Sequence, residues 1–113
     1  MPIAALADQP WVARSGSNMI ARSCREAGFS PRLVMISRDP LANRALIAQG
    51  LAVTLFPRLL TSAFGGLELR PIDGPGPERD VYALLPPGHR HPLAAAVLEA
   101  LSAVAEGLGC APA

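Results

Sequence analysis

Polar side chains that could bind an anion follow two apolar runs in the first part of the chain. Arg14 follows "PWVA", and the polar residues of "SGSN" come directly after it. Arg38 follows the apolar run "RLVMIS" in the same way. A guanidinium can bind a carboxylate through two parallel hydrogen bonds, and free N–H groups at a helix N-terminus also favour an anion. These residue types predict a site for a small organic acid.

Motifs of common catalytic sites are not found in the sequence. All ten basic residues are arginine, so no lysine is available for a Schiff base or a phosphate-binding loop. The sequence has no G-x-S-x-G, G-x-x-x-x-G-K-[ST] or G-x-G-x-x-G motif. His89 and His91 form an H-x-H pair without a third ligand nearby. We therefore expect no enzyme, no catalytic residue, no metal site and no cofactor.

Composition limits the class of protein further. The chain has 113 residues, of which 50% are hydrophobic, and this is typical of one globular domain. Its formal net charge is +1, so no broad basic surface is available for nucleic acid. The start "MPIAALADQPW" lacks the basic region of a signal peptide, and no apolar run approaches the ~20 residues that span a membrane. We expect a cytoplasmic protein without membrane contact.

Apolar periodicity predicts alternating strands and helices over the first half of the chain. We expect strands at residues 10–14, 32–37 and 51–56, the last two buried on both faces, and helices at 19–29 and 40–49. This order is typical of parallel strands joined by right-handed helical crossovers. Such a fold would position the polar residues that follow the strands along one edge of the sheet.

Turn residues predict where the helices begin and end. Turn residues and lines of apolar residues also predict the elements of the second half of the chain. Gly28 and Gly50 stand where a left-handed C-cap is needed, and Asp39 can cap the helix that Pro40 begins. Further on, we expect a helical turn at 58–64, strands at 67–72 and 81–86, a loop at 73–80 and a long helix at 92–108.

Four single residues are given structural roles. Trp11 is expected to pack between a strand and a helix, and Tyr82 to lie in the core with its hydroxyl at an edge. Cys24 lies on the predicted inner face of a helix, and Cys110 lies in the tail. Two cysteines are too few for a disulfide scaffold, so both thiols are expected to be inert.

Several of these segments together resemble a known family. The succession "AGFSPRLVMIS", "ALIAQGLAVTLFPRLL", "GLELRPI", "RDVYALLPPG" and "HPLAAAVLEAL" is similar to the C-terminal half of the effector-binding domain of LysR-type transcriptional regulators. The most specific segment is "LIAQGLAVTLFP", in which the family usually has Gly-Leu-Gly-Val. Here Ala52 stands in place of the second glycine. The resemblance covers about residues 8 to 105, which is nearly the whole chain.

The resemblance implies a fold of the α/β class. It is a periplasmic-binding-protein-like (type II) lobe with a mostly parallel sheet flanked by helices, and the other lobe is incomplete. Residues 8–72 would form the second lobe of the effector-binding domain. Residues 73–107 would be the crossover strand and C-terminal helix that belong to the first lobe, and 108–113 a tail. The winged helix of the family is not in the sequence, so we expect a fragment or truncated product that reaches DNA only through a missing N-terminal domain.

The expected ligand site lies outside the carboxyl ends of the strands, as in other open parallel sheets, and the resemblance implies the same place. Ser15 and Ser17 could instead only cap a helix, and Asp39 is expected to be a cap. Arg14 and Arg38 could be solvated or paired with Asp39, and Thr54 could bond neighbouring backbone. The candidate effector-binding residues are Arg14, Ser15, Ser17, Asn18, Ser37, Arg38, Thr54 and Phe56.

The resemblance also implies a homodimer or higher oligomer. In the family, a first-lobe helix packs antiparallel against a second-lobe helix of the other subunit, and here these would be residues 17–27 and 92–107 or their neighbours. Two other functions share the predicted fold class: a fragment of a transporter's solute-binding protein, and a small flavodoxin-like enzyme. The first hypothesis remains the effector-sensing part of a regulator, which binds a small acidic effector.

Overall fold

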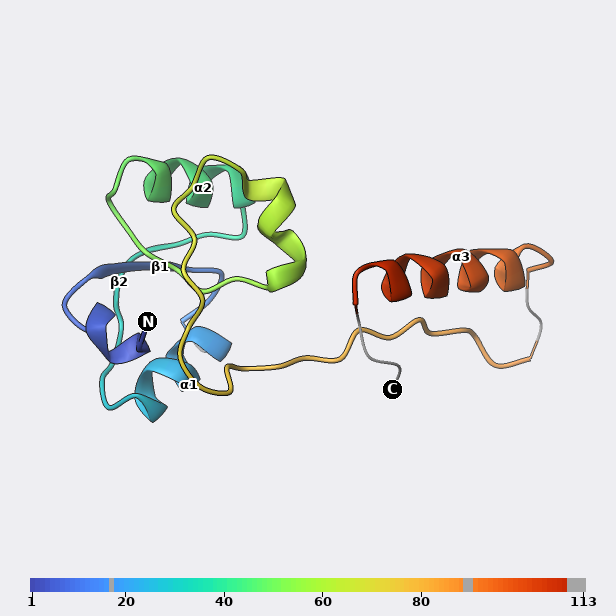
Figure 1. Cartoon of the computed structure of the whole chain (residues 1–113), viewed down its shortest axis with the longest axis horizontal. Coiled ribbons are helices and arrows are strands. Elements are labelled where there is room, and N and C mark those ends of the chain that lie inside the picture. Colours follow the sequence, from blue (N-terminus) through green and yellow to red (C-terminus); the bar gives the residue numbers. More distant parts are fainter. Residues whose placement is uncertain (17, 89–90, 110–113) are drawn as a thin grey trace. The chain divides into compact units, whose positions relative to one another are not determined.

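The computed structural model describes residues 1–16, 18–88 and 91–109, and divides the chain into two compact units, Met1–Pro77 and Glu78–Ala113 (Figure 1). Both units contain elements that the sequence predicts. The first unit contains η1 (Ile3–Leu6), β1 (Pro10–Ala13), α1 (Met19–Glu26), β2 (Arg32–Ile36), α2 (Pro40–Ala48) and η2 (Arg58–Phe64), and the second contains α3 (Ala94–Gly107).

Strand β1 lies at the centre of the first unit. It pairs in parallel with β2, with Ala13 opposite Ile36. On its other side, Trp11 forms a parallel bridge with Val53, supported by a hydrogen bond of 3.0 Å from the Val12 N–H to the Val53 carbonyl. The parallel arrangement of the three chain segments is thus as predicted. The segment 51–56, however, contributes this single bridge and not the strand that we expected.

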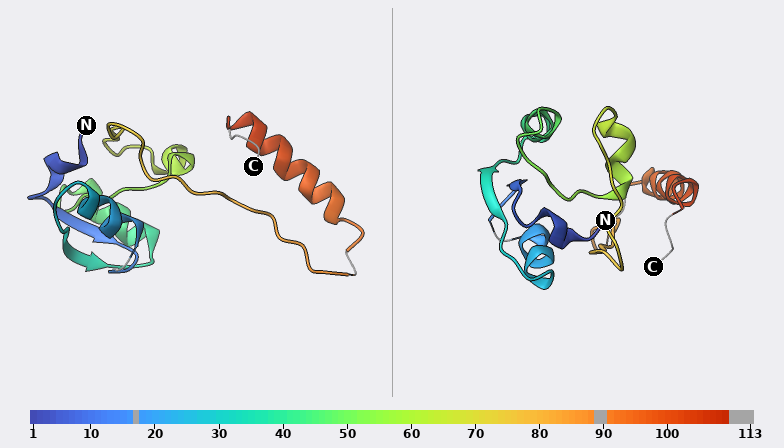
Figure 2. Two further views of the ribbon diagram at one scale, coloured as in Figure 1. Left: turned by 90° about the horizontal axis from the view of Figure 1, so that it is seen from below. Right: turned by 60° about the vertical axis from the view of Figure 1, so that its left-hand side comes forward.

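The two crossover helices cover opposite sides of this sheet, α1 on one and α2 on the other (Figures 1 and 2). The core lies on the α1 side, where Trp11 and Cys24 are both 0% exposed and Ile20 is also buried. The Trp11 ring lies 6.2 Å from that of Phe29. The predictions that Trp11 packs between strand and helix and that Cys24 lies on an inner helix face are therefore confirmed.

Glycine ends both crossover helices, as predicted. Gly28 has φ 94° and Gly50 has φ 72°, in the left-handed region that a residue with a Cβ seldom adopts. After α2, the Leu51 N–H donates to the Leu46 carbonyl and the Gly50 N–H donates to the Ile47 carbonyl, both over 3.0 Å. This pair of bonds is a Schellman motif, which satisfies the last carbonyls of the helix.

Burial of β2 differs from the prediction. Its residues alternate between exposed and half-buried, and Val34 and Ile36 are 49% and 57% exposed. The expectation of burial on both faces was therefore wrong. The helix α2, on the side away from the core, likewise buries none of its own residues. The apolar run at residues 32–37 predicted the strand correctly, but it did not indicate how many faces of that strand are buried.

Two predicted strands in the second half are absent from the sheet. Residues 67–72 are irregular and residues 81–86 are extended without a partner strand in the described part of the chain. Tyr82 is 66% exposed and its hydroxyl donates to Asp80, so its expected place in a core was wrong. A strand needs a neighbour to satisfy its backbone, and the described residues supply none here.

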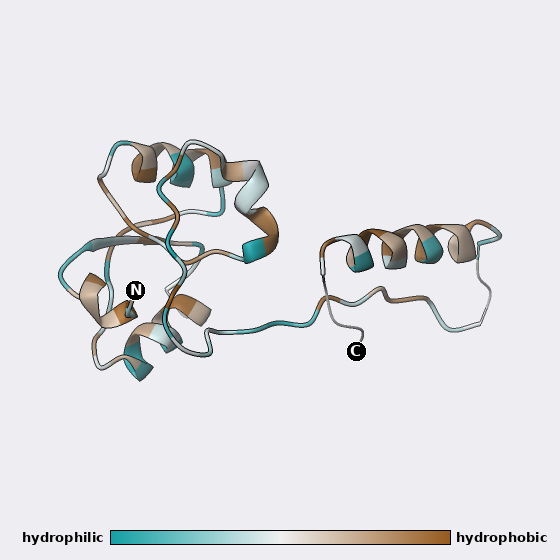
Figure 3. Cartoon of the chain, in the orientation of Figure 1, coloured by the Kyte–Doolittle hydropathy of each residue, from teal (hydrophilic) through white to brown (hydrophobic). Residues whose placement is uncertain are grey.

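The second unit consists of this extended segment followed by α3. The helix carries the predicted apolar stripe, which Figure 3 shows by its hydropathy, but all five residues of the stripe are exposed by more than half. Within the residues that the structure describes, no helix is both long and apolar enough to cross a bilayer. The stripe consists of Leu93, Val97, Leu101, Val104 and Leu108.

Candidate functional site

The carboxyl ends of the neighbouring segments meet at one edge of the first unit. The Ser37 N–H donates to the Ala13 carbonyl over 2.9 Å, so Arg14 and Ser37 begin two adjacent loops. On the other side of β1, the Thr54 hydroxyl donates to the Val12 carbonyl over 2.9 Å. We call this edge the rim. It comprises residues 14–16 and 18, 37–39 and 54–56.

The first two loops of the rim also contact one another. A Cβ built on Gly16 would lie 3.8 Å from Cδ1 of Ile36, the last residue of β2. The loop after β1 therefore lies beside the end of β2. Because of this proximity, the loops that carry Arg14 and Arg38 leave the sheet side by side.

The two arginines of the rim are free to meet a ligand. Arg14 and Arg38 are both exposed. Neither forms an ion pair with an acid in the described ranges 1–16, 18–88 and 91–109, so the alternative in which they pair with Asp39 is not what the structure shows. A free guanidinium keeps its full set of donors available for a carboxylate.

Asp39 acts as a helix cap, as expected. Its Oδ1 accepts a hydrogen bond of 2.9 Å from the Leu41 N–H at the start of α2, and Pro40 occupies the first helical position. Ser37 supports this turn, because its Oγ accepts a bond of 3.1 Å from the Asp39 N–H. The negative charge of Asp39 at the rim is therefore explained by its role as the cap of α2.

Asn18 caps α1. Its Oδ1 accepts a hydrogen bond of 3.1 Å from the Ala21 N–H, and its Nδ2 donates to the Ser15 carbonyl over 2.8 Å. Both ends of the amide are thus used in fixing the loop between Ser15 and α1. Ser17 lies outside the described residues. Ser15 itself is half-buried beside Arg14.

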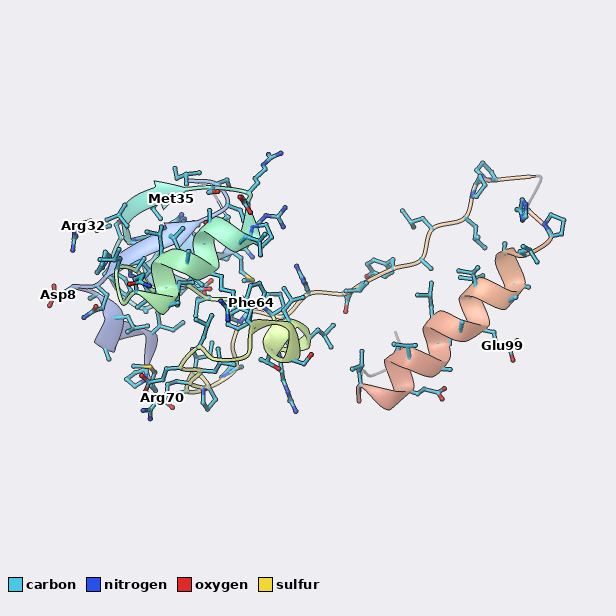
Figure 4. All side chains as sticks on the ribbon, turned by 90° about the horizontal axis from the view of Figure 1, so that it is seen from above. Asp8, Arg32, Met35, Phe64, Arg70 and Glu99 are labelled. Carbon is cyan, nitrogen blue, oxygen red and sulfur yellow. The ribbon has the colours of Figure 1, made fainter. Side chains whose placement is uncertain are left out.

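Thr54 and Phe56 form the third part of the rim. Besides its bond to Val12, the Thr54 hydroxyl lies 3.4 Å from the Leu55 carbonyl, which confirms the expectation that it bonds neighbouring backbone. Phe56 is half-buried, and its ring meets that of Phe64 on η2 edge to face at 5.4 Å. Figure 4 shows Phe64 on this helix. The aromatic pair supplies an apolar surface next to polar loops.

Asn43 belongs to the same region and was missed by sequence reasoning. Its Nδ2 donates to the Ser37 carbonyl over 3.0 Å, which places the side chain under the loop after β2. Its Oδ1 is buried and accepts no hydrogen bond from the described part of the chain. A buried acceptor without a hydrogen-bond donor lowers stability, so binding of an N–H or O–H group at this oxygen would be favourable. The signal was available: Asn43 is four residues after Asp39, on the same helix face.

The described residues contain no group of three or more histidine, cysteine or acidic side chains that could hold an ion. His91 is exposed and its Nδ1 accepts a hydrogen bond from the Leu93 N–H, while His89 lies outside the described residues. The thiol of Cys24 is buried in the core, and this burial raises its pKa. The polar side chains of the described rim residues are those of arginine, asparagine, serine, threonine and aspartate.

Comparison with known proteins identifies the family. The family described as LysR substrate binding domain matches residues 1–109 of the 113. The chain has no significant match among curated proteins or among solved structures. Because the family match covers nearly the whole length, the chain belongs to the family of LysR substrate-binding domains, as its sequence motifs predicted.

Proposed function

We propose that this chain is the effector-sensing portion of a LysR-type transcriptional regulator and that its rim binds a small organic acid. The family match supports the coarser statement, an effector-binding part of such a regulator. Domains of this family bind regulatory ligands and are not catalytic. DNA binding would require a separate domain, and the site of action would be the cytoplasm, where LysR-type regulators work.

One observation carries the choice of an acidic ligand. Two exposed guanidinium groups, Arg14 and Arg38, follow the adjacent ends of β1 and β2 and have no acidic partner in the described part of the chain. The nearest acid in sequence, Asp39, already accepts a backbone hydrogen bond at α2. An anion between the two loops would gain two charge-assisted interactions, each stronger than a neutral hydrogen bond.

The other rim groups would define the shape of the ligand. The amide oxygen of Asn43 lacks a donor and would suit a hydroxyl or amine on the effector. The Thr54 hydroxyl donates to Val12 but still has oxygen lone pairs available. Phe56 would cover an apolar part of the molecule. The preferred ligand class is therefore a small carboxylate that also carries a hydrogen-bond donor.

Removal of one arginine tests this assignment. We expect Arg38→Ala to weaken the binding of carboxylates at least about tenfold, because a hydrogen bond to a charged group contributes roughly 1.5–3 kcal/mol. The measurement is a calorimetric titration with a panel of small hydroxy, amino and aromatic carboxylates. Arg32→Ala is the matched control, since Arg32 is also exposed but begins β2 at the opposite end of the strand (Figure 4). Equal affinities in both variants would remove Arg38 from the site.

Asp39 offers a second test of the sign of the charge. Asp39→Asn keeps a side-chain oxygen for the Leu41 N–H, so the cap survives while the negative charge is lost. We expect this variant to keep its stability and to bind carboxylates more tightly. Asp39→Ala should instead lose about 1 kcal/mol of stability with the cap. A lower affinity of Asp39→Asn for carboxylates would contradict an acidic effector.

A further inference from the structure

The short helix η2 lies next to one end of the rim. It begins at Arg58, directly after the rim residues 54–56 and Pro57, and it ends at Phe64 (Figure 1). A 3-10 helix of seven residues is unusually long, and its hydrogen bonds have poorer geometry than those of an α-helix. The position of η2 therefore depends on its contacts with other elements.

The first of these contacts joins two aromatic rings. Phe64 meets the rim residue Phe56 with the ring centroids 5.4 Å apart and an angle of 74° between the ring planes. The edge of one ring thus meets the face of the other, which is a favoured geometry for aromatic pairs. Both residues are half-buried, so the pair keeps part of its surface accessible. Phe64 therefore extends the apolar surface that Phe56 provides at the rim.

The second contact fixes the end of η2. Arg44 of α2 donates a hydrogen bond of 2.7 Å from its Nη2 to the carbonyl of Gly65, the residue that follows η2. A Cβ built on Gly66 would lie 3.6 Å from the same nitrogen, so the guanidinium lies against the backbone of this turn. A cation is favourable here, because the last carbonyls of a helix have no partner within it. In the described chain, this hydrogen bond is what joins the end of η2 to another helix.

The helix that carries Arg44 also supports the rim. Asn43, the neighbour of Arg44, donates to the Ser37 carbonyl over 3.0 Å. The helix α2 therefore contacts the loop after β2 through Asn43 and the end of η2 through Arg44. Among the described residues, Arg44 forms no ion pair that would compete with its bond to Gly65. Adjacent residues of one helix thus hold both a polar loop of the rim and the element that carries Phe64.

We propose that Phe64 determines the specificity of the rim and that Arg44 is the residue that positions Phe64. The carboxylate of the effector would bind at Arg14 and Arg38, and a planar ring of the same molecule would pack against Phe56 and Phe64. An aromatic ring gains edge-to-face or offset-stacked contacts with such a pair that a saturated ring does not gain. The inference rests on the proposed function, which it narrows to carboxylates that carry an aromatic ring.

A purely structural role of Phe64 makes a different prediction. If its ring served only to hold η2 in place, its loss would lower the affinity for every carboxylate in the same proportion. If it contacts the effector, its loss changes the ratio of affinities for two ligands that differ only in their ring. The ratio is also insensitive to changes in charge, because both ligands carry the same carboxylate.

Calorimetric titrations of the 113-residue chain with mandelate and hexahydromandelate measure this ratio. The two anions share a carboxylate and a hydroxyl, and they carry a phenyl and a cyclohexyl ring respectively. We expect the unmodified chain to bind mandelate about three- to tenfold more tightly. Phe64→Leu keeps an apolar side chain and should reduce this preference to less than about twofold. Leu60→Ala is the matched control, since Leu60 is an exposed apolar residue of the same helix, and should leave the preference unchanged.

A double-mutant cycle tests whether Arg44 acts through Phe64. Arg44→Ala should reduce the preference for mandelate as Phe64→Leu does, and it should cause no further change in the Phe64→Leu background. Arg44→Lys can still donate to the Gly65 carbonyl and should restore part of the preference. Arg25→Ala is the control for the lost charge, because Arg25 lies in the last turn of α1, and Asn18 at the rim caps the opposite end of that helix.

Three results would overturn the proposal. The first is equal affinity of the unmodified chain for the two anions, and the second is an unchanged preference in Phe64→Leu. The third is an effect of Arg44→Ala on the preference that is the same with and without the Phe64 ring. Lactate, which has no ring, separates this inference from the proposed function, because its binding should depend on Arg38 and not on Phe64. Lactate binding that does not depend on Arg38 would contradict both proposals, whereas the three results above contradict this one alone.

Discussion

Cys24 is the residue whose protonation is most clearly set by the fold. Its side chain is 0% exposed, and burial raises the pKa of the thiol above its ordinary value of 9.0. The native state then keeps a proton that the unfolded chain loses, so stability is fully present below pH 9 and decreases as the pH rises through the higher native pKa. We expect the free energy of unfolding to decrease above pH 9.0 by no more than about 1.4 kcal/mol per pH unit from this group.

Urea denaturation followed by Trp11 fluorescence between neutral pH and pH 10 measures this decrease. A Cys110→Ser background removes the other thiol, and Cys24→Ala within that background is the comparison. The slope above pH 9 should be shallower in the Cys24→Ala variant, whatever its stability at neutral pH. Identical slopes in the two proteins would show that the thiol has the same pKa in the folded and unfolded chain.

Residues with a local role were predicted well, and residues whose role depends on distant neighbours were not. Asp39 caps a helix that starts at the next residue, and it accepts the N–H of Leu41 two residues later, so its role can be read from the local sequence. The packing of Trp11 between a strand and a helix was predicted, but its Nε1 also donates to the Leu6 carbonyl of a short helix, η1, that we did not predict. The prediction that Tyr82 is buried was wrong, because its burial would require a neighbouring strand. Asn43 was missed although it is only six residues from Ser37, because their bond joins a helix to the loop after a strand.

At the scale of elements, the glycine that ends α2 allows a test of how much its left-handed backbone angle contributes to stability. Gly50 has φ 72°, and a side chain at this angle costs about 1–2 kcal/mol, although open space surrounds the position. We expect Gly50→Ala to lower the free energy of unfolding by at least about 1 kcal/mol. Gly65→Ala is the matched control, because Gly65 has φ −56° and its added Cβ also meets nothing within 4 Å.

Urea titrations with Trp11 as the reporter compare the two glycine variants. The control should change stability by no more than about 0.5 kcal/mol, as is usual for surface substitutions. Equal losses of stability in both variants would mean that the left-handed backbone angle is not the reason for glycine at position 50. Rescue by Gly50→Asn to a value between glycine and alanine would support the left-handed cap, since asparagine tolerates this region better than other residues.

The helices and the first two strands could be predicted because their signals are local. Periodicity, caps and glycine stops placed α1, α2 and α3 within a few residues of their observed bounds. The predictions of strands at 51–56, 67–72 and 81–86 were wrong, because a strand forms only where another segment pairs with it. An apolar run such as residues 81–86 indicates an extended chain, but pairing depends on segments elsewhere.

At the scale of the whole molecule, the rim could be predicted because strand order determines it. Three parallel segments end at one edge, and the Ser37–Ala13 and Thr54–Val12 bonds bring the predicted residues there. Which side chains then face a ligand did not follow from the order, because caps and ligand contacts use the same residue types. Asn18 and Asp39 illustrate this ambiguity, since both lie at the rim and both cap a helix.

The division of the chain leads to a prediction about folding. All buried residues of the described chain lie within residues 1–77, including Trp11, Val12 and Cys24. Because the second unit contributes none of this core, a chain of residues 1–77 should fold by itself. We expect its free energy of unfolding to lie within about 1 kcal/mol of that of the full chain, since the buried residues of the described chain all belong to this unit.

Trp11 reports the outcome for residues 1–77, since it is the only tryptophan and is 0% exposed. A folded unit should show the blue-shifted emission of a buried indole and one cooperative urea transition, together with carboxylate binding equal to that of the full chain. A red-shifted emission without a transition would contradict the division, because the core would then depend on residues beyond Pro77.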